Sequence, residues 1–378
     1  MINRFTFLFT KFTTNYRLIL LLALFMLPIT ACNAQSTKYS FELIDVPSPS
    51  LKDALIDSHS TYKIGISLPP YYKNSDKKYP VVYNLSGYTV FPGQYPSTEA
   101  LTQSHNNNSI KEMIVVDISG YNVFLGTMYA NSSVTGNWED FVTKDVINFI
   151  DKNYRTIPKK EARAIMGHSM GAAAVANISL KHTDKYSVVY LMSPAIGKSA
   201  EDYMSVMFSD NSILNQLEIL SEKLSNVKDE NFQSEIIKIL DTFESKHTIL
   251  WTLAYGMAFS PDLSEPLKMR LPFVKDETGK YVKNQNVYDQ WINGFAEFDL
   301  KIKLNKQELK KYKLYSINCG NKDSPFILNG TKRFTELLFL NNIPYTMDWY
   351  DGDHSNRIGE KLVESVYPII YANLEIQD

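Results

Sequence analysis

"RAIMGHSMGAAAV", residues 163–175, joins an apolar run to a run of small residues through Gly-His-Ser-Met-Gly. The apolar run is typical of a buried strand, and the small residues after it favour a tightly packed helix. A serine on the turn between them is held clear of the sheet, and the N–H that follows it points at an oxyanion developing there. A Cβ on either flanking glycine would collide with the neighbouring strand and helix. The stretch therefore predicts Ser169 as a nucleophile and the backbone N–H of Met170 as an oxyanion donor.

Strand-like runs of β-branched and aromatic residues recur on both sides of this unit. They lie at residues 38–46, 61–69, 79–86, 112–119, 163–167, 187–193, 313–320 and 345–352. Helical periodicity falls between the later runs, at residues 138–154, 170–182, 331–342 and 357–374. Strand alternating with helix predicts an α/β fold, with a mostly parallel central sheet flanked by helices on both faces. Because no repeat or linker divides the chain, we expect a single catalytic domain over residues 38–378.

A serine hydroxyl is a weak nucleophile unless a base takes its proton. Of the six histidines, only His354 follows the last predicted strand, at its carboxyl end, in "YDGDHSN". The order Ser, acid, His along the chain, which α/β-hydrolases share, fits His354 as the base.

The orienting acid should follow a strand between the serine and the histidine. Asp323 stands just beyond such a strand in "KLYSINCGNKDSPF". Asp351 and Asp353 flank His354 and are the alternatives, but an immediate neighbour rarely orients the far nitrogen of the ring. We predict Ser169, His354 and Asp323 as the catalytic residues. No Cys/His cluster has the spacing of zinc ligands, and no metal or organic cofactor is implied.

The stretch between residues 193 and 313 is far longer than an ordinary crossover, and we expect a helical insertion, or cap, at about 200–310. Residues 213–224 and 232–243 carry leucine and isoleucine at helical spacing and predict two amphipathic helices. Residues 251–273 are aromatic, rich in methionine and broken by prolines, which fits either packing inside the insertion or lining a cleft. We expect the insertion to lie over the carboxyl edge of the sheet and to wall the site. Its candidate substrate-binding residues are Trp251, Tyr255 and Phe259.

The N-terminal segment reads as an export signal. Three basic residues precede "LILLLALFMLPI" (18–29), which is too short to span a bilayer comfortably. "ITAC" (29–32) resembles a bacterial lipobox, in which the cysteine is lipidated, and ordinary cleavage after Ala34 is the alternative. We predict a lipoprotein-type signal peptide at residues 1–31 with Cys32 as the lipidation site. The protein would then be exported, either as a membrane-anchored lipoprotein or in a periplasmic or secreted form.

The composition and net charge of the chain argue against nucleic acid as a binding partner. The chain is 44% hydrophobic and 21% charged, as in ordinary globular proteins, with a net charge of −2 and no basic runs. Such a chain is a poor nucleic-acid binder. Its two cysteines are Cys32 and Cys319, and the second lies in a predicted buried strand.

Two further motifs resemble the putative esterase (esterase D-like) family of the α/β-hydrolases. "ISLPPYYKNSDKKYPVVYNLSGY" (66–88) is similar to the family's Leu-Pro-x-x-Tyr and Tyr-Pro-Val before a strand and a glycine turn. "GNWEDFVTKDVINFIDKNYRT" (136–156) is similar to its tryptophan-containing helix. The resemblance spans roughly residues 40–195 and 312–360. The family includes S-formylglutathione hydrolases, feruloyl and acetylxylan esterases, siderophore esterases and mycolyltransferases.

The resemblance implies an α/β-hydrolase fold and a serine carboxylic-ester hydrolase that works through an acyl-enzyme, on a small-molecule or glycan-linked ester. Carried over by position, the backbone N–H groups of Tyr88 and Met170 would form the oxyanion hole. Trp138, on the tryptophan-containing helix, is a further substrate-binding candidate. The chain has Ser86 where the family usually has histidine, so the support of the oxyanion loop is in question. Acyl transfer of the mycolyltransferase type and a catalytically degenerate binding protein are the alternative functions.

Overall fold

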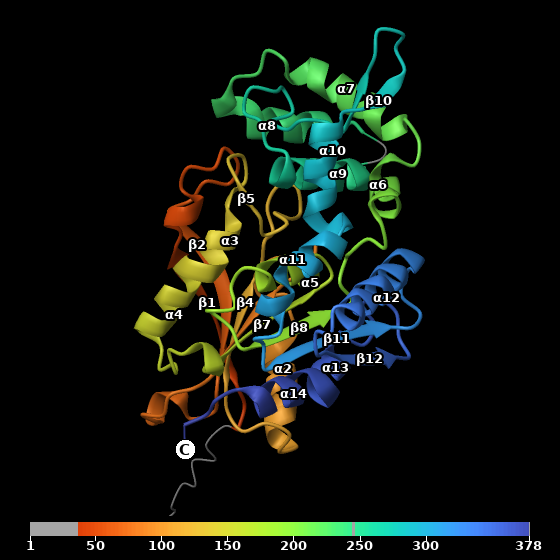
Figure 1. The fold of residues 1–378 in the computed structure, drawn as a ribbon. Coiled ribbons are helices and arrows are strands. Elements are labelled where there is room, and N and C mark those ends of the chain that lie inside the picture. The colour runs from red at the N-terminus through yellow and green to blue at the C-terminus, as the bar shows by residue number, and fades with distance from the viewer. Residues whose placement is uncertain (1–36, 244–245, 378) are drawn as a thin grey trace, which may run out of the picture. The chain divides into compact units, whose positions relative to one another are not determined.

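The computed structural model describes residues 37–243 and 246–377 (Figure 1). Eight strands form one sheet in the order β1-β2-β4-β3-β7-β8-β11-β12. The strands are β1 (Ser40–Pro47), β2 (Thr61–Leu68), β3 (Val81–Leu85), β4 (Ile114–Ile118), β7 (Arg163–His168), β8 (Val188–Met192), β11 (Leu314–Gly320) and β12 (Thr346–Tyr350). All neighbours pair in parallel except that β2 runs against both β1 and β4. The eight predicted strands are thereby confirmed. The predicted signal peptide and Cys32 lie outside the described residues.

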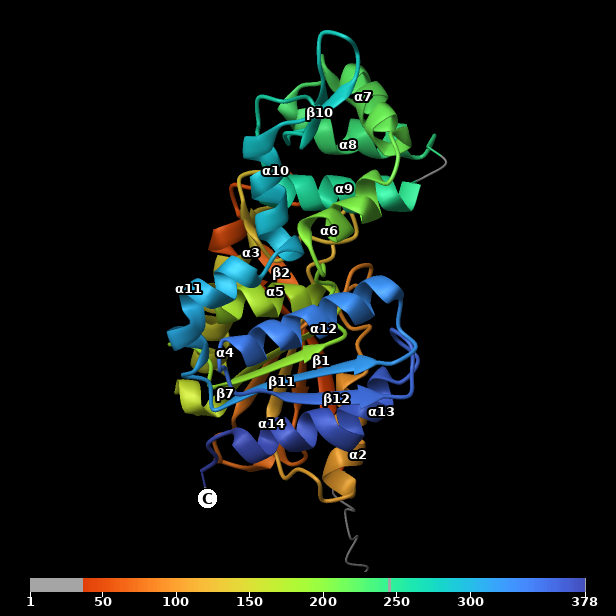
Figure 2. The same ribbon diagram turned by 45° about the vertical axis from the view of Figure 1, so that its right-hand side comes forward.

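Helices cover both faces of this sheet, as Figure 2 shows. One face carries α2 (Ser97–Asn106), α13 (Ile358–Lys361), a π-helical turn (η6, Leu362–Val366) and α14 (Tyr367–Asn373). The other carries α3 (Trp138–Asp140), a π-helical turn (η3, Phe141–Val146), α4 (Ile147–Asn153), α5 (Met170–Ser179) and α12 (Pro325–Leu340).

The central strands are apolar on both sides because both faces are covered. In β3, Val81 and Tyr83 enter the core under α5, and Val82 between them enters the core under α2 and α14. No residue of β3, β4, β7 or β8 is exposed. This burial on both faces is the physical reason why these strands are continuous apolar runs in the sequence.

The long crossover between β8 and β11 is a helical insertion. It contains α6 (Ala200–Phe208), α7 (Ser212–Leu224), α8 (Asp229–Leu240), α9 (Lys246–Phe259), the hairpin β9 (Phe273–Lys275) and β10 (Tyr281–Lys283), α10 (Gln285–Trp291), a π-helical turn (η5, Ile292–Ala296) and α11 (Asp299–Leu309). The two amphipathic helices were predicted, and one apolar face of each is buried, whereas Ile219 and Ile237 are exposed. The hairpin and the helical start of the aromatic stretch were not predicted. Across the described residues, no helix is both long and apolar enough to cross a membrane.

The insertion contacts the rest of the domain mainly at α5 and at the loop before α3. Ser132, in the short ribbon of β5 (Asn131–Ser132) and β6 (Gly136–Asn137), donates from Oγ to the Met257 carbonyl of α9 at 2.6 Å. Asn177 of α5 donates from Nδ2 to the Gly294 carbonyl of η5 at 2.9 Å. His247 and Trp251, in the first turns of α9, contact Tyr88 in the loop after β3.

Candidate active site

Ser169 occupies the turn between β7 and α5 in a conformation that few non-glycine residues adopt, with φ 56° and ψ −116°. Such strain persists only where the surroundings enforce it. The Ser169 N–H donates to the Met192 carbonyl at 2.9 Å, and the Ser169 carbonyl accepts from the Ala195 N–H at 3.1 Å. The turn is therefore fixed to the end of β8 on both sides of the serine.

The two glycines of the motif are sterically required, as the sequence predicted. A Cβ on Gly167 would lie 2.5 Å from the Gly171 carbonyl carbon, inside the start of the helix. A Cβ on Gly171 would lie 2.0 Å from the Leu85 carbonyl oxygen at the end of β3. Both distances are far below any real contact. The helix can begin this close to the sheet only without these two side chains.

The structure brings together the three predicted catalytic side chains. His354 Nε2 lies 2.9 Å from Ser169 Oγ, and His354 Nδ1 lies 2.8 Å from Asp323 Oδ2. A carboxylate can only accept, so Nδ1 carries the proton and Nε2 is left to accept from the serine hydroxyl. The Asp323 side chain is fully buried, whereas His354 is 36% exposed. The arrangement can deprotonate the serine and stabilise the imidazolium that results.

Close contact between two loops brings Asp323 to His354. β11 and β12 are parallel neighbours, so their carboxyl ends share one edge of the sheet. Beyond them, the Asn321 N–H donates to the Tyr350 carbonyl at 2.8 Å and the Lys322 N–H to the Gly352 carbonyl at 2.9 Å. A Cβ on Gly320 would stand 2.2 Å from the Gly352 oxygen, so this approach requires glycine.

The two alternative acids are engaged elsewhere. Asp353 Oδ1 accepts from the N–H groups of Ser355 and Asn356 at 2.9 and 2.8 Å, and these bonds lower its pKa. Asp351 is exposed and pairs with Lys322 at 2.7 Å. Neither carboxylate has a hydrogen bond to the His354 ring among the described residues, and the geometry favours Asp323.

His168 is a neighbour of the site that the sequence did not single out. Its Nε2–H donates to the His354 backbone carbonyl at 2.8 Å, and the two rings lie 4.8 Å apart. Burial, and then the neighbouring His354, lower the pKa of His168 to about 4, so its ring is neutral at neutral pH. It holds the backbone of the catalytic base. No motif marked it, because the position before the nucleophile accepts many residue types.

The two residues predicted for the oxyanion hole flank Ser169. Met170 is the first residue of α5, where backbone N–H groups have no partner inside the helix. A Cβ on Gly87 would lie 3.4 Å from the Ser169 Cβ, which places the peptide that ends in the Tyr88 N–H beside the serine. Two such donors on one side of the nucleophile can receive the negative charge of a tetrahedral intermediate.

The oxyanion loop, in which Ser86 replaces the histidine usual in the family, is held by hydrogen bonds of Tyr129. The buried hydroxyl of Tyr129 lies 3.0 Å from both the Ser86 and the Ile118 carbonyls, and it accepts from the Gly120 N–H at 2.9 Å. The Ser86 N–H donates to the Ile118 carbonyl at 3.0 Å. The Tyr129 hydroxyl therefore ties the beginning of the oxyanion loop to the loop after β4.

Among the aromatic candidates for substrate binding, Trp251 is the one in contact with a residue of the site. Its ring packs edge-on against the Tyr88 ring, with centroids 4.8 Å apart, and His247 packs against the same ring at 5.6 Å. Both residues lie on α9. The insertion thus contacts the Tyr88 ring through the first turns of α9.

Trp138 and Tyr255 are core residues, contrary to the prediction. Trp138 is 2% exposed and donates from Nε1 to the Thr135 carbonyl at 2.8 Å. Tyr255 is 0% exposed, and its hydroxyl donates to the Trp291 carbonyl at 2.8 Å. Neither presents surface to a ligand. Phe259 lines a cavity to which none of the three catalytic residues contributes. Within the described residues, no three His, Cys, Asp or Glu side chains are grouped to hold a metal ion.

Comparison with known proteins gives the family. The model of the family described as "Putative esterase" matches residues 58–244, a range that contains Ser169 but ends before Asp323 and His354. Among solved structures, the chain is similar to a ferulic acid esterase, with a TM-score of 0.54 and 18% identity over 90% of this chain and 100% of that one. It is also similar to an S-formylglutathione hydrolase from Agrobacterium tumefaciens, with a TM-score of 0.53 and 13% identity over 90% and 97%. The chain belongs to the putative esterase family of the α/β-hydrolases, and it is a carboxylic-ester hydrolase.

Proposed function

We propose that this esterase uses Ser169 as its nucleophile, His354 as its general base and acid, and Asp323 as the group that orients the imidazole. His354 Nε2 takes the hydroxyl proton as Ser169 Oγ attacks the ester carbonyl. The N–H groups of Met170 and Tyr88 stabilise the oxyanion. The intermediate collapses to an acyl-enzyme, and the alcohol leaves with the proton from His354. Water, deprotonated by the same nitrogen, then releases the acid and restores the serine.

The observation that carries this proposal is the pair of hydrogen bonds through one imidazole, 2.9 Å to Ser169 Oγ and 2.8 Å to Asp323 Oδ2. The three residues come from separate loops at the ends of β7, β11 and β12. A binding protein with the same fold would not need all three side chains in this hydrogen-bonded arrangement. The geometry therefore favours an enzyme over a degenerate binder.

The surroundings of Tyr88 favour an ester with an aromatic or otherwise flat acyl group. Trp251 and His247 stand edge-on to Tyr88 beside the proposed oxyanion hole. The likeness to a ferulic acid esterase agrees with this substrate class.

We also propose that the protein is exported and anchored by a lipid on Cys32. The support is the order of features in the first residues: basic side chains, a short apolar run, then "ITAC". An extracellular site of action fits glycan-linked or other environmental esters.

A panel of p-nitrophenyl esters of rising acyl length, beside feruloyl and acetylated-sugar esters, tests the activity and the substrate class. Ser169→Ala should lower turnover by about 10³-fold or more, and it should abolish covalent labelling by a fluorophosphonate. Labelling at an unchanged rate in Ser169→Ala would show that another residue is the nucleophile. Adding alcohol acceptors and measuring ester products separates hydrolysis from acyl transfer.

A further inference from the structure

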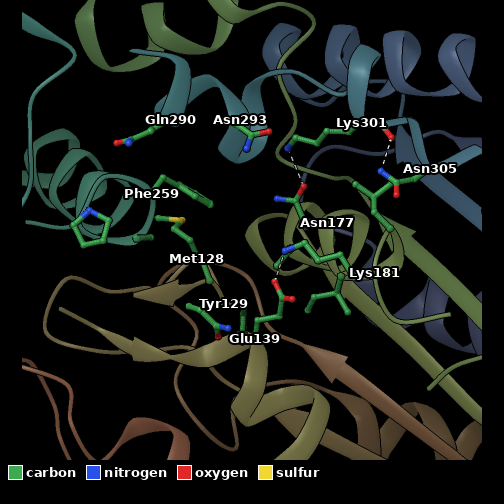
Figure 3. Close-up of a pocket in the computed structure, with 17 residues that line it drawn as sticks. Met128, Tyr129, Glu139, Asn177, Lys181, Phe259, Gln290, Asn293, Lys301 and Asn305 are labelled. Atoms are coloured by element: carbon green, nitrogen blue, oxygen red, sulfur yellow. Dashed lines mark hydrogen bonds and ion pairs between the residues drawn. The ribbon is translucent and has the colours of Figure 1, made fainter. Parts of the chain in front are cut away.

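A cavity of about 450 Å³ lies where the insertion meets α5, away from the catalytic residues (Figure 3). This volume is typical of sites that hold small ligands. One wall comes from the second half of α5 and the loop before α3, and the other comes from α9, η5 and α11. Ser169 precedes α5, and Ala174, the first residue of the helix to line the cavity, lies five residues further on, so the cavity begins about 7.5 Å along the helix from the serine at ~1.5 Å per residue.

The cavity combines an apolar floor with a polar rim. Its apolar lining includes Met128, Ala174, Ile178, Phe259 and Pro261. The Phe259 ring is partly exposed to it. The polar side chains come from both walls, and Figure 3 shows them around the opening: Glu139, Asn177, Lys181, Gln290, Asn293, Lys301 and Asn305.

Lys301 is a largely buried amine whose hydrogen bonds, in the part of the chain that the structure describes, go to no carboxylate. Its Nζ donates to the Asn177 Oδ1 at 2.9 Å and to the Gly294 carbonyl at 2.7 Å, both neutral oxygens. Among the described residues it makes no ion pair, and burial lowers its pKa to about 7. Nζ also lies 4.3 Å from the centroid of the Phe298 ring, a cation–π contact that uses no oxygen acceptor, so one of its three N–H donors has no oxygen acceptor in the described chain. Glu297 acts on Lys301 only as a nearby charge that raises its pKa, without an ion pair between the two, so an anion in the cavity would add a directly bonded countercharge.

Glu139, the carboxylate in the lining, is already neutralised. His182 Nε2 and Lys181 Nζ both lie 2.9 Å from its oxygens. Burial opposes its ionisation, but hydrogen bonds from His182 and Lys181 outweigh that effect, and the pKa of Glu139 is lowered. Its charge therefore does not repel an anion bound at Lys301.

The hydrogen-bond donors and acceptors of the rim that remain unused belong mostly to amide side chains. Gln290 accepts from Arg270 through Oε1 at 2.9 Å, which leaves its Nε2 donors. Asn305 donates from Nδ2 to the Lys301 carbonyl at 2.9 Å, which leaves its Oδ1. The exposed Asn293 amide has no hydrogen-bond partner in the described chain. An amide offers donors and an acceptor side by side, which matches hydroxyl groups that both donate and accept.

We propose that this cavity is a second ligand site and that its ligand is a sugar acid, a polyhydroxylated ring carrying a carboxylate. The carboxylate binds the free donor of Lys301, the hydroxyls bind the amides of Gln290, Asn293 and Asn305, and the apolar face of the ring lies on Phe259. The site uses none of the proposed catalytic residues. The titrations of the wild type and of the cavity variants therefore do not depend on the proposed triad, and only the labelling experiment uses it.

Isothermal titration of the full chain with glucuronate and with glucose tests the proposal. Glucuronate should bind at least about tenfold more tightly than glucose, the order of a charge-assisted hydrogen bond. Lys301→Met should remove that difference. Lys303→Met removes the same charge two residues along α11 from an exposed position, and it should leave binding unchanged. Equal affinity for the two sugars in the wild type would overturn the proposal.

Two further measurements fix the location and the ligand class. Asn293→Ala alters an exposed side chain, so the fold should stay intact and the affinity for both sugars should fall about threefold or more. This variant keeps the test valid even if Lys301→Met misfolds. Protein labelled at the serine by a fluorophosphonate should bind glucuronate as before, and loss of binding there would place the ligand in the catalytic site instead. Acetate or inorganic phosphate binding as tightly as glucuronate would reduce the cavity to a simple anion site and overturn the sugar assignment.

Discussion

The Nδ1–H of His354 donates to Oδ2 of Asp323 at 2.8 Å, although the two residues lie 31 positions apart in the chain. Asp353, the immediate neighbour of His354, instead turns its carboxylate onto the N–H groups of Ser355 and Asn356. The adjacent carboxylate caps its own turn, and the distant one accepts the hydrogen bond from the His354 ring.

Asp323→Asn should therefore be nearly as inactive as Ser169→Ala. An amide at this position permits the wrong tautomer of His354, which typically costs about 10⁴-fold in turnover. Asp353→Asn is the matched control and should stay within about tenfold of the wild type, because it disturbs only the turn. Turnover with native circular dichroism checks both, and the reverse ranking would move the acid to the histidine loop.

His168→Ala should lower kcat about tenfold and leave KM nearly unchanged. The substitution removes the donor that holds the His354 backbone, and a hydrogen bond of this kind contributes about 1 kcal/mol. His168→Gln can place an amide N–H near the position of Nε2 and should recover most of the activity. If His168→Gln were as slow as His168→Ala, the ring would act through its shape and not through the hydrogen bond.

Burial of His168 also predicts a pH dependence of stability. Its pKa is about 4 in the fold and 6.5 for the unperturbed side chain, so the unfolded chain binds this proton first as the pH falls. The fold should lose stability from this residue between about pH 6.5 and pH 4, with no contribution above pH 7. Chemical denaturation of the wild type and of His168→Gln at pH 7 and pH 4.5 should show a smaller pH effect in the variant. Identical pH effects would exclude His168 as the source.

Trp251→Ala should lower kcat/KM for feruloyl esters about tenfold or more and change that for acetyl esters little. The indole packs edge-on against Tyr88 beside the proposed oxyanion hole, where we expect a large flat acyl group to contact it and an acetyl group not to. Phe259→Ala removes an aromatic side chain of the same insertion that lines the other cavity, and it should leave both activities near the wild type. Equal losses on both esters in Trp251→Ala would indicate a purely structural role.

Cys32→Ala should prevent lipidation and release the protein from the membrane or leave it unprocessed. Partition into detergent and incorporation of labelled palmitate measure this, with the buried Cys319→Ala as the control that should still be labelled. An intact mass for the mature protein that begins at Gln35 would instead show cleavage after Ala34.

The sequence by itself determined the strands and the Gly-His-Ser-Met-Gly turn, and it predicted the chain order of the proposed catalytic residues. These features are local or periodic: strands buried on both faces are apolar throughout, and a serine between two glycines after a strand needs no distant partner to be recognised. The amphipathic helices of the insertion were predicted for the same reason, since Leu217 and Leu220 repeat at the helical period and both are buried.

Only the tertiary structure decided which residues meet across the chain. The choice of Asp323 over its rivals depends on the contact of Gly320 with Gly352, which two separate loops make. Trp138 and Tyr255 have the composition of a binding surface but are buried, because an aromatic ring packs equally well against the core and against a ligand. His168 and Lys301 acquire their roles from burial beside residues far away in sequence. Burial is a property of the assembled fold, and no local pattern encodes it.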